Sequence, residues 1–357
     1  MIPLEGVLGR KTILGIDIGT VSIKAVEISG GGGRVHLTNY GIAESGEYLD
    51  RSNSVIQSSS FKIDEAAGAE VLSFLIGKMG VKTKDAVSAI PTFAAFTSVI
   101  EMPLMSSSEV AQAIPYQARS LVPLPISDVT IDWMPIGQFE DEKGIKKQQI
   151  FMVSVPNEVI KTYQAVFKRA GINLKMLEIE GMSMARSISS AGDGNVMTID
   201  IGALSTSVAV VSNGSLKYST QTDFAGSSLT QALVKGLGIS PKRAELLKKQ
   251  RGLSGMSGEY GLSTLMQPFL DVIIGEAKRV RDIFERKYGQ KIEKVSLLGG
   301  GAELYGIDQY VANQIGLPVL RGDGLRGINY PTIVAPLAPW IGSRFAIAIG
   351  AALKIFV

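Results

Sequence analysis

Two apolar segments in separate halves of the chain lead into the same short polar turn. Residues 13–16 and 196–199 each precede an Asp-Ile-Gly tripeptide, at 17–19 and at 200–202, and a second apolar segment follows each turn. Each copy predicts a β-hairpin whose turn carries an acidic residue, a glycine and small hydroxyl side chains. Glycine lets the backbone come close to a ligand, and the N–H groups of such a turn bind anions. The two copies therefore predict two turns that close on one polyphosphate.

The hydrophobic pattern also predicts strands and helices after each hairpin. In the first half a helix is expected at 65–79, followed by a buried strand at 86–90. The second half predicts helices at 229–236, 241–250 and 265–288, then a strand at 294–298, a glycine turn and a helix at 302–314. This repeated order predicts an α/β fold of two duplicated lobes with a cleft between them.

Between about 84 and 171 the pattern changes. Strand-like runs at 96–101, 129–136 and 150–155 alternate with helical runs at 107–119 and 157–170. Ser106 followed by Glu109 is a helix-start pattern, because the two side chains can each accept a backbone N–H. The segment is expected to form a compact α+β insertion with its own small sheet.

Composition narrows the function classes. The chain has 357 residues, 45% of them hydrophobic and 19% charged, with 36 Lys and Arg against 33 Asp and Glu. A near-balanced charge does not indicate a nucleic-acid-binding protein, and the absence of cysteine excludes disulfides and thiolate sites. The apolar run at 345–357 is too short to span a bilayer and is expected to be a packed helix.

The turn residues are the first candidates for chemistry. Asp17 and Asp200 follow apolar strands and suit Mg²⁺ at nucleotide phosphates, directly or through water; alternatively, they cap their own turns. Thr20, Ser22, Ser205 and Thr206 offer hydroxyl groups to phosphate oxygens. Lys24 offers a charge, or is simply a solvated surface lysine.

Three further sets have functional and ordinary explanations. Gly299, Gly300 and Gly301 join a strand to a helix and allow a base or phosphate to approach the backbone. Glu245 with Lys248, and Glu276 with Arg279, have the i,i+3 spacing of an exposed ion pair. Glu178 and Glu180 share one face of a strand-like run, where either orients a water or is merely exposed.

With these motifs the chain resembles the actin-like ATPase superfamily. Asp17–Lys24 and Asp200–Ser207 resemble the two phosphate motifs of this superfamily, and Leu298–Leu304 resembles its adenosine motif. The two connecting segments of the superfamily are matched by Glu178–Ala185 and Ile341–Ala352. The resemblance implies ATP or ADP with Mg²⁺ on Asp17 and Asp200, and catalytic roles for Asp17, Glu180 and Asp200. The nucleotide contacts that it implies are Gly19, Thr20, Val21, Ser22, Lys24, Gly202, Ala203, Ser205, Thr206, Gly226, Glu245, Lys248, Arg279, Gly299, Gly300, Gly301 and Glu303. At most slow hydrolysis is expected, because no dedicated general base is evident. In addition, the second turn has Ala203 at the position where the first turn has the hydroxyl of Thr20.

Within the superfamily the insertion is similar to that of the FtsA-like branch, and above all to PilM-like type IV pilus assembly proteins. The matching residues include Glu101-Met102-Pro103, Gln117-Ala118-Arg119 and Asp132. The resemblance implies an actin-like (ribonuclease H-like) fold. It divides the chain into a first lobe (10–84, 172–194 and 331–357), an FtsA/PilM-type subdomain (85–171) and a second lobe (195–330) with a helical subdomain at about 231–290.

The same resemblance implies a cytoplasmic protein held at the inner membrane by its partners. The expected partner is the N-terminal tail of a PilN-like inner-membrane protein, bound beside the insertion, together with other pilus assembly components. Self-association with further copies of the chain is left open. No nucleic acid and no membrane span are expected. The alternatives are an FtsA-like polymerising membrane tether and a sugar or acetate kinase of the same fold.

Overall fold

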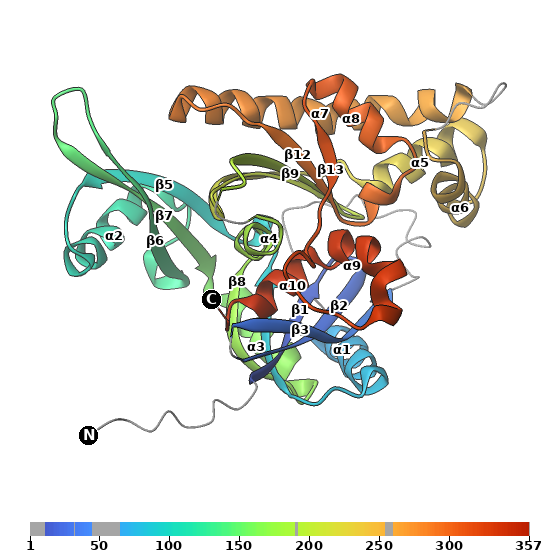
Figure 1. The fold of residues 1–357 in the computed structure, drawn as a ribbon, viewed down its shortest axis with the longest axis horizontal. Coiled ribbons are helices and arrows are strands. Elements are labelled where there is room, and N and C mark those ends of the chain that lie inside the picture. Colours follow the sequence, from blue (N-terminus) through green and yellow to red (C-terminus); the bar gives the residue numbers. More distant parts are fainter. Residues whose placement is uncertain (1–10, 32, 45–64, 190–191, 254–259, 357) are drawn as a thin grey trace.

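The computed structural model describes residues 11–31, 33–44, 65–189, 192–253 and 260–356. Within these ranges the chain forms two lobes, each on its own five-stranded sheet, and an inserted subdomain with a three-stranded sheet. In Figure 1 the first lobe lies at the bottom, the second lobe at the top, and the inserted subdomain at the left beside them.

The first lobe has its sheet in the order β3-β2-β1-β4-β8. The apolar run in β1 is continuous because both faces of the sheet are covered: α1 and α3 pack on one face, and α9 and α10 on the other. The strands are β1 (Lys11–Ile18), β2 (Ser22–Gly31), β3 (Arg34–Glu44), β4 (Asp85–Ile90) and β8 (Asn173–Ile179). The helices are α1 (Glu65–Met79), α3 (Asn157–Arg169), α4 (Glu180–Ile188), η5 (Thr332–Leu337), α9 (Ala338–Arg344) and α10 (Ala346–Leu353).

The second lobe repeats this sheet in the order β11-β10-β9-β12-β13, with the same mixture of antiparallel and parallel pairs. Its helices α5, α7 and α8 cover one face, and α4 meets the other. The strands are β9 (Asn195–Ile201), β10 (Thr206–Ser212), β11 (Ser215–Thr222), β12 (Lys294–Leu298) and β13 (Val319–Arg321). The helices are α5 (Gly226–Leu237), α6 (Pro241–Arg251), α7 (Tyr260–Tyr288), η4 (Gly300–Glu303) and α8 (Ile307–Ile315). The predicted duplication of an α/β lobe is therefore confirmed.

The inserted subdomain consists of an antiparallel sheet, β5-β7-β6, with α2 packed on one face. Ser106 caps α2: its hydroxyl accepts the Glu109 N–H, and the Glu109 carboxylate accepts the Ser106 N–H, as the sequence predicts. The elements are η2 (Thr92–Ala94), β5 (Phe96–Pro103), α2 (Ser107–Leu121), η3 (Ile126–Asp128), β6 (Val129–Glu140) and β7 (Lys146–Pro156).

The boundaries of the insertion differ from the predicted 85–171. β4 pairs in parallel with β1, and α3 packs against α1, so both belong to the first lobe. The insertion's own sheet and helix lie between Phe96 and Pro156. Two helices also differ: α7 begins at Tyr260, and the helix expected at 302–314 is η4 followed by α8, because Gly306 separates them in a left-handed conformation.

Two short helices cross between the lobes. A Cβ on Gly350 of α10 would lie 1.8 Å from the Ser183 carbonyl oxygen of α4, so only glycine allows this approach. Beside the crossing, Arg186 bonds both Glu178 oxygens, at 2.5 and 2.8 Å, and the Gly350 carbonyl at 2.6 Å. This buried ion pair fixes α4 between β8 and α10.

Among the described residues, no single helix has the length and hydropathy to cross a membrane. The segment Thr332–Arg344 and α10 meet that criterion only when taken as a pair, and they are bent by 87°. The side chains of α10 are almost all buried in the first lobe.

Candidate functional site

A cavity of about 550 Å³ lies between the two lobes. Both Asp-Ile-Gly turns, the start of α5, the Gly299–Gly301 turn and the beginning of α4 line it. Its volume is in the range typical of small-molecule sites. Segments far apart in the sequence therefore meet at one place, as the two-turn hypothesis requires.

The two turns have the same backbone geometry. Gly19 donates its N–H to the Ser22 carbonyl at 3.0 Å, and Gly202 donates to the Ser205 carbonyl at 3.0 Å. A Cβ on Gly202 would lie 2.8 Å from the Ser205 oxygen, which explains why this position is glycine. The tight turns leave small side chains facing the cavity between two strands.

In the first turn, Asp17 is paired with a cation. It lies opposite Lys24 in the β1–β2 ladder, and the Lys24 Nζ is 2.8 Å from Asp17 Oδ2. Burial lowers the pKa of Lys24, but the carboxylates of Asp17 and Asp200 outweigh this effect, so the pKa is raised. Lys24 is therefore a cavity residue with a fixed charge, and the alternative of a solvated surface lysine is wrong.

In the second turn, Asp200 has no such partner. Ser207 occupies the opposing position in the β9–β10 ladder, and the Asp200 carboxylate accepts no hydrogen bond from the described residues. Burial raises the pKa of Asp200 to about 6, with Lys24 acting in the opposite sense. A Cβ on Gly299 would lie 2.2 Å from Asp200 Oδ1, so the glycine turn after β12 packs directly on this carboxylate.

Glu180 is the first residue of α4 and faces the same cavity. Burial, followed by the charges of Asp17 and Asp200, raises the pKa of Glu180 to about 8. Its carboxylate accepts a long backbone hydrogen bond, 3.4 Å, from Thr92 of η2. Glu180 is thus mostly protonated at neutral pH when no cation is bound beside it.

The start of α5 forms the opposite wall. The Gly226 and Ser227 N–H groups bond to the Gly202 and Ala203 carbonyls at 3.1 and 2.8 Å, which joins the second turn to the helix. Lys248 bonds Glu245 at 2.6 Å and the Gly226 carbonyl at 2.8 Å. Burial raises the pKa of Glu245, but the charge and hydrogen bond of Lys248 outweigh burial, so the pKa is lowered. This pair is buried and lines the cavity, so the exposed ion pair suggested by its spacing is wrong.

Most of the predicted contacts come together here. The predicted residues that line the cavity are Asp17, Gly19, Thr20, Val21, Ser22, Lys24, Glu180, Asp200, Gly202, Ala203, Ser205, Gly226, Glu245, Lys248, Gly299, Gly300, Gly301 and Glu303. Two are placed elsewhere. Thr206 is buried and donates its hydroxyl to the Phe224 carbonyl at 2.7 Å. Arg279 on α7 bonds Glu276 through two nitrogens and also Thr220 of β11, which holds it outside the cavity.

The carboxylates fit a hydrated divalent cation better than a directly bound one. Within the described part of the chain, no group of three or more metal-ligating side chains is present. Asp17 is already engaged by Lys24, whereas the half-buried Asp200 carboxylate has no hydrogen-bond or ion-pair partner in the described part of the chain. A Mg²⁺ ion keeps several waters, and such a hydrated ion would neutralise Asp200.

Arg344, at the end of α9, is a cavity residue that sequence reasoning missed. Its guanidinium bonds Glu44 at the end of β3 and lies 3.7 Å from Glu303 of η4, so it bridges the two lobes. The guanidinium also lies over the Trp340 ring, with the Arg344 Cζ 5.4 Å from the ring centroid. The available signal was that Arg344 is the only charged residue between Pro331 and Leu353.

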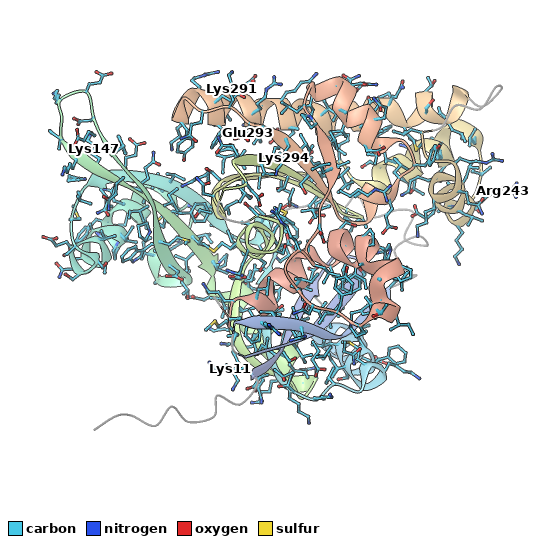
Figure 2. The ribbon with its side chains drawn as sticks, in the orientation of Figure 1. Lys11, Lys147, Arg243, Lys291, Glu293 and Lys294 are labelled. Atoms are coloured by element: carbon cyan, nitrogen blue, oxygen red, sulfur yellow. The ribbon has the colours of Figure 1, made fainter. Side chains whose placement is uncertain are left out.

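Other cavity residues were also missed, two of them in an apolar segment and two directly beside predicted contacts. Pro91 and Phe93, at the entry to the insertion, line the cavity, as do Ser227 and Lys249. The charged residues labelled in Figure 2, such as Lys147 on the β6–β7 hairpin and Lys291 after α7, lie on the outside of the molecule, and none of them lines the cavity.

Known proteins share this architecture. The solved structure of a PilM-PilN type IV pilus biogenesis complex covers 97% of this chain and 98% of its own, with 20% identity and a TM-score of 0.82. The superposition on MreB5 of Spiroplasma citri bound to ADP covers 97% of this chain and 96% of the MreB5 chain, with 14% identity and a TM-score of 0.53. These likenesses establish the actin-like fold.

Sequence comparisons agree with the fold. The cell division protein FtsA of Enterococcus faecalis is 23% identical over 335 residues, which are 82% of this chain and 74% of FtsA. The sequence profile described as type IV pilus assembly protein PilM matches residues 15–356. Because this match covers nearly the whole chain, the chain belongs to the PilM family of type IV pilus assembly proteins.

Proposed function

We propose that this chain is a nucleotide-binding assembly protein of the type IV pilus inner-membrane complex. It binds ATP or ADP with Mg²⁺ in the cavity between the lobes, and it holds the cytoplasmic N-terminal tail of a PilN-like membrane protein. The observation that carries the nucleotide site is the meeting of three glycine turns and one helix N-terminus on a single cavity of about 550 Å³.

The cavity suits a nucleotide chemically. The N–H groups of the two turns and the Lys24 ammonium favour phosphate oxygens, and Gly299–Gly301 leave the backbone open to the rest of the ligand. Mg²⁺ with its waters would sit beside Asp200 and offset its charge, and Asp17, which is already paired with Lys24, would contact the ion only through water. The MreB5 neighbours were solved with ADP and with AMPPNP, which supports a nucleotide in the equivalent cleft.

Hydrolysis in this site is expected to be slow. Glu180 is placed to orient a water, but its pKa of about 8 keeps it largely protonated at neutral pH without a cation. A protein that uses nucleotide mainly to set its shape needs no fast chemistry, because differential affinity for two shapes is sufficient.

The partner proposal rests on the family and on the likeness to the chain of the PilM-PilN complex. The insertion offers surfaces for a short tail, around Phe93–Ile100 and around Tyr116, which is 70% exposed on α2. In this proposal the protein is cytoplasmic and peripheral to the inner membrane, contacts other pilus components and is able to self-associate. It binds no nucleic acid.

The FtsA relatives favour a second candidate, a polymerising membrane tether. The two functions differ in one simple measurement. A tether would sediment with anionic vesicles without any partner, whereas the proposed assembly protein would do so only with the PilN-like tail present on the vesicle.

The direct test is calorimetric titration of the purified protein with Mg-ATP and Mg-ADP, followed by anisotropy of a labelled PilN-like tail with and without nucleotide. We expect saturable binding of both ligands and a tail affinity that depends on nucleotide. A scrambled tail of the same composition is the control. Absence of nucleotide binding, or turnover as fast as that of a metabolic kinase, would overturn the proposal.

A further inference from the structure

The second phosphate turn is connected to the inserted subdomain by a short path through one hairpin. β10 begins directly after the turn at Thr206, and β11 returns antiparallel to it as the edge strand of the second sheet. β11 then lies against β5 and β6 of the insertion. A movement of the turn and its hairpin can therefore reach the insertion through β11 directly, although β11 also packs against α4.

Lys217 on β11 is the extra residue of a β-bulge. Val210 pairs with Tyr218 and Val211 with Leu216, so Lys217 has no residue opposite it in the ladder. A bulge of this kind re-aims the side chain of the extra residue. Here the side chain turns from the sheet toward the insertion.

Ile136 on β6 is the extra residue of a second bulge. Pro135 pairs with Ile150 and Gly137 with Gln149, which leaves Ile136 outside the ladder. The Lys217 ammonium donates a hydrogen bond to the Ile136 carbonyl. Two bulges from different parts of the molecule thus face each other and are joined by one charge-assisted bond. The Ile136 side chain is buried in a core that includes residues of the first lobe, of β7 and of the β10–β11 hairpin.

The lysine is not an ordinary surface charge. It is partly buried, and burial alone lowers the pKa of Lys217, with no described carboxylate offsetting it. Removing an ammonium group from water without an acidic partner is unfavourable. The position is therefore better explained by the contact that it makes than by solubility.

The insertion is also attached to the cavity where the chain enters it. Pro91 and Phe93 line the cavity, and the Thr92 N–H donates to the Glu180 carboxylate at 3.4 Å. The insertion thus has one attachment on the first-lobe side of the cavity and another, through Lys217, on the second lobe. Closure of the lobes must move these two attachments relative to each other.

We propose that Lys217 is the positioning residue through which nucleotide at the second phosphate turn sets the orientation of the inserted subdomain. This inference rests on the proposed nucleotide site and states what bound nucleotide would control, namely the orientation of the inserted subdomain. Nucleotide would order β11, Lys217 would carry the change to the Ile136 bulge, and β6 and its neighbours would become more protected.

The test is hydrogen–deuterium exchange of the full chain with and without Mg-ADP, in the wild type and in Lys217→Met. We expect nucleotide to slow exchange in β6 several-fold in the wild type and to leave it unchanged in Lys217→Met, with nucleotide affinity altered by less than about twofold. Lys235→Met, which removes an exposed lysine of α5, is the matched control and should behave like the wild type.

If nucleotide still slows exchange of β6 in a folded Lys217→Met by as much as in the wild type, the inference is overturned, while the proposed nucleotide site stands. If no nucleotide binds to the wild type, the proposed function itself fails. Should Lys217→Met not fold, a nucleotide titration of the wild type decides: protection of β6 must rise over the same concentrations as that of β11. Protection of β11 without β6 would contradict the link.

Discussion

At the scale of residues, the two phosphate turns differ in the residue that lies opposite the aspartate in the strand ladder. Lys24 stands opposite Asp17, whereas Ser207 stands opposite Asp200. The first carboxylate is therefore neutralised within the protein, and the second is left to a bound cation. The two turns thus have the same backbone hydrogen bonds but differ in what neutralises the aspartate.

Replacing Asp200→Asn is expected to separate stability from binding. Burial raises the pKa of Asp200 from 3.8 to about 6, so its ionisation opposes folding. This cost builds up as the pH rises from 3.8 to about 6 and is fully present at pH 7, where the amide should stabilise the unliganded protein by roughly 1–2 kcal/mol. Mg²⁺-dependent nucleotide binding should be lost. Thermal unfolding with and without Mg-ADP measures both effects, and the exposed Asp223→Asn is the control. A destabilised variant that still binds Mg-ADP would contradict the assignment.

Glu180 predicts the pH dependence of whatever hydrolysis occurs. If Glu180 acts as the proposed base, only its deprotonated carboxylate is active, so the rate should rise with pH through the pKa of about 8 and level off above it. Bound Mg²⁺ would move this rise to lower pH. Glu180→Gln should give a slower rate with a flat profile, measured as phosphate release at saturating ATP. A rate in the wild type that falls over this range would exclude Glu180 as the base.

At the scale of elements, the crossing of α4 and α10 holds the two lobes together. Gly350→Ala would place a Cβ 1.8 Å from a backbone oxygen of α4, and is expected to cost on the order of 3 kcal/mol. Gly275→Ala is the matched control on α7, where a Cβ meets nothing within 4 Å. That change should stabilise the helix by about 0.5–1 kcal/mol. Urea unfolding of both variants checks the difference, and equal midpoints would show that α10 can shift.

The elements with local signals were predictable from the sequence. Both hairpins, the capped start of α2 and the glycine turn after β12 depend on residues within a few positions of one another. The membership of β4 and α3 in the first lobe was not, because it depends on pairing with β1 and packing on α1 across many residues. The cavity showed the same division: the turn residues were found, whereas Thr206 and Arg279 were misplaced and Arg344 was missed.

At the scale of the whole molecule, Arg344 bridges the lobes at the cavity. With Arg344→Met, the Glu44 and Glu303 carboxylates would face each other and the phosphates without a cation between them. We expect nucleotide affinity to fall about tenfold, which is about 1.4 kcal/mol. Calorimetric titration measures it, with Arg326→Met, from an exposed pair with Asp193, as the control. Equal losses in both variants would mean that only the overall charge matters.

The position of α10 also has a consequence for how the protein is made. This helix packs on β1, so closely that a Cβ on Gly15 would meet the Ala348 carbonyl, yet it follows the entire second lobe in the sequence. During translation the face of the first sheet that α10 covers therefore stays exposed until the end of the chain is made. By then all strands and covering helices of the second lobe have been synthesised. We infer that the second lobe matures first on the ribosome, and that the first lobe and the cavity between them are completed only when residues 346–353 emerge.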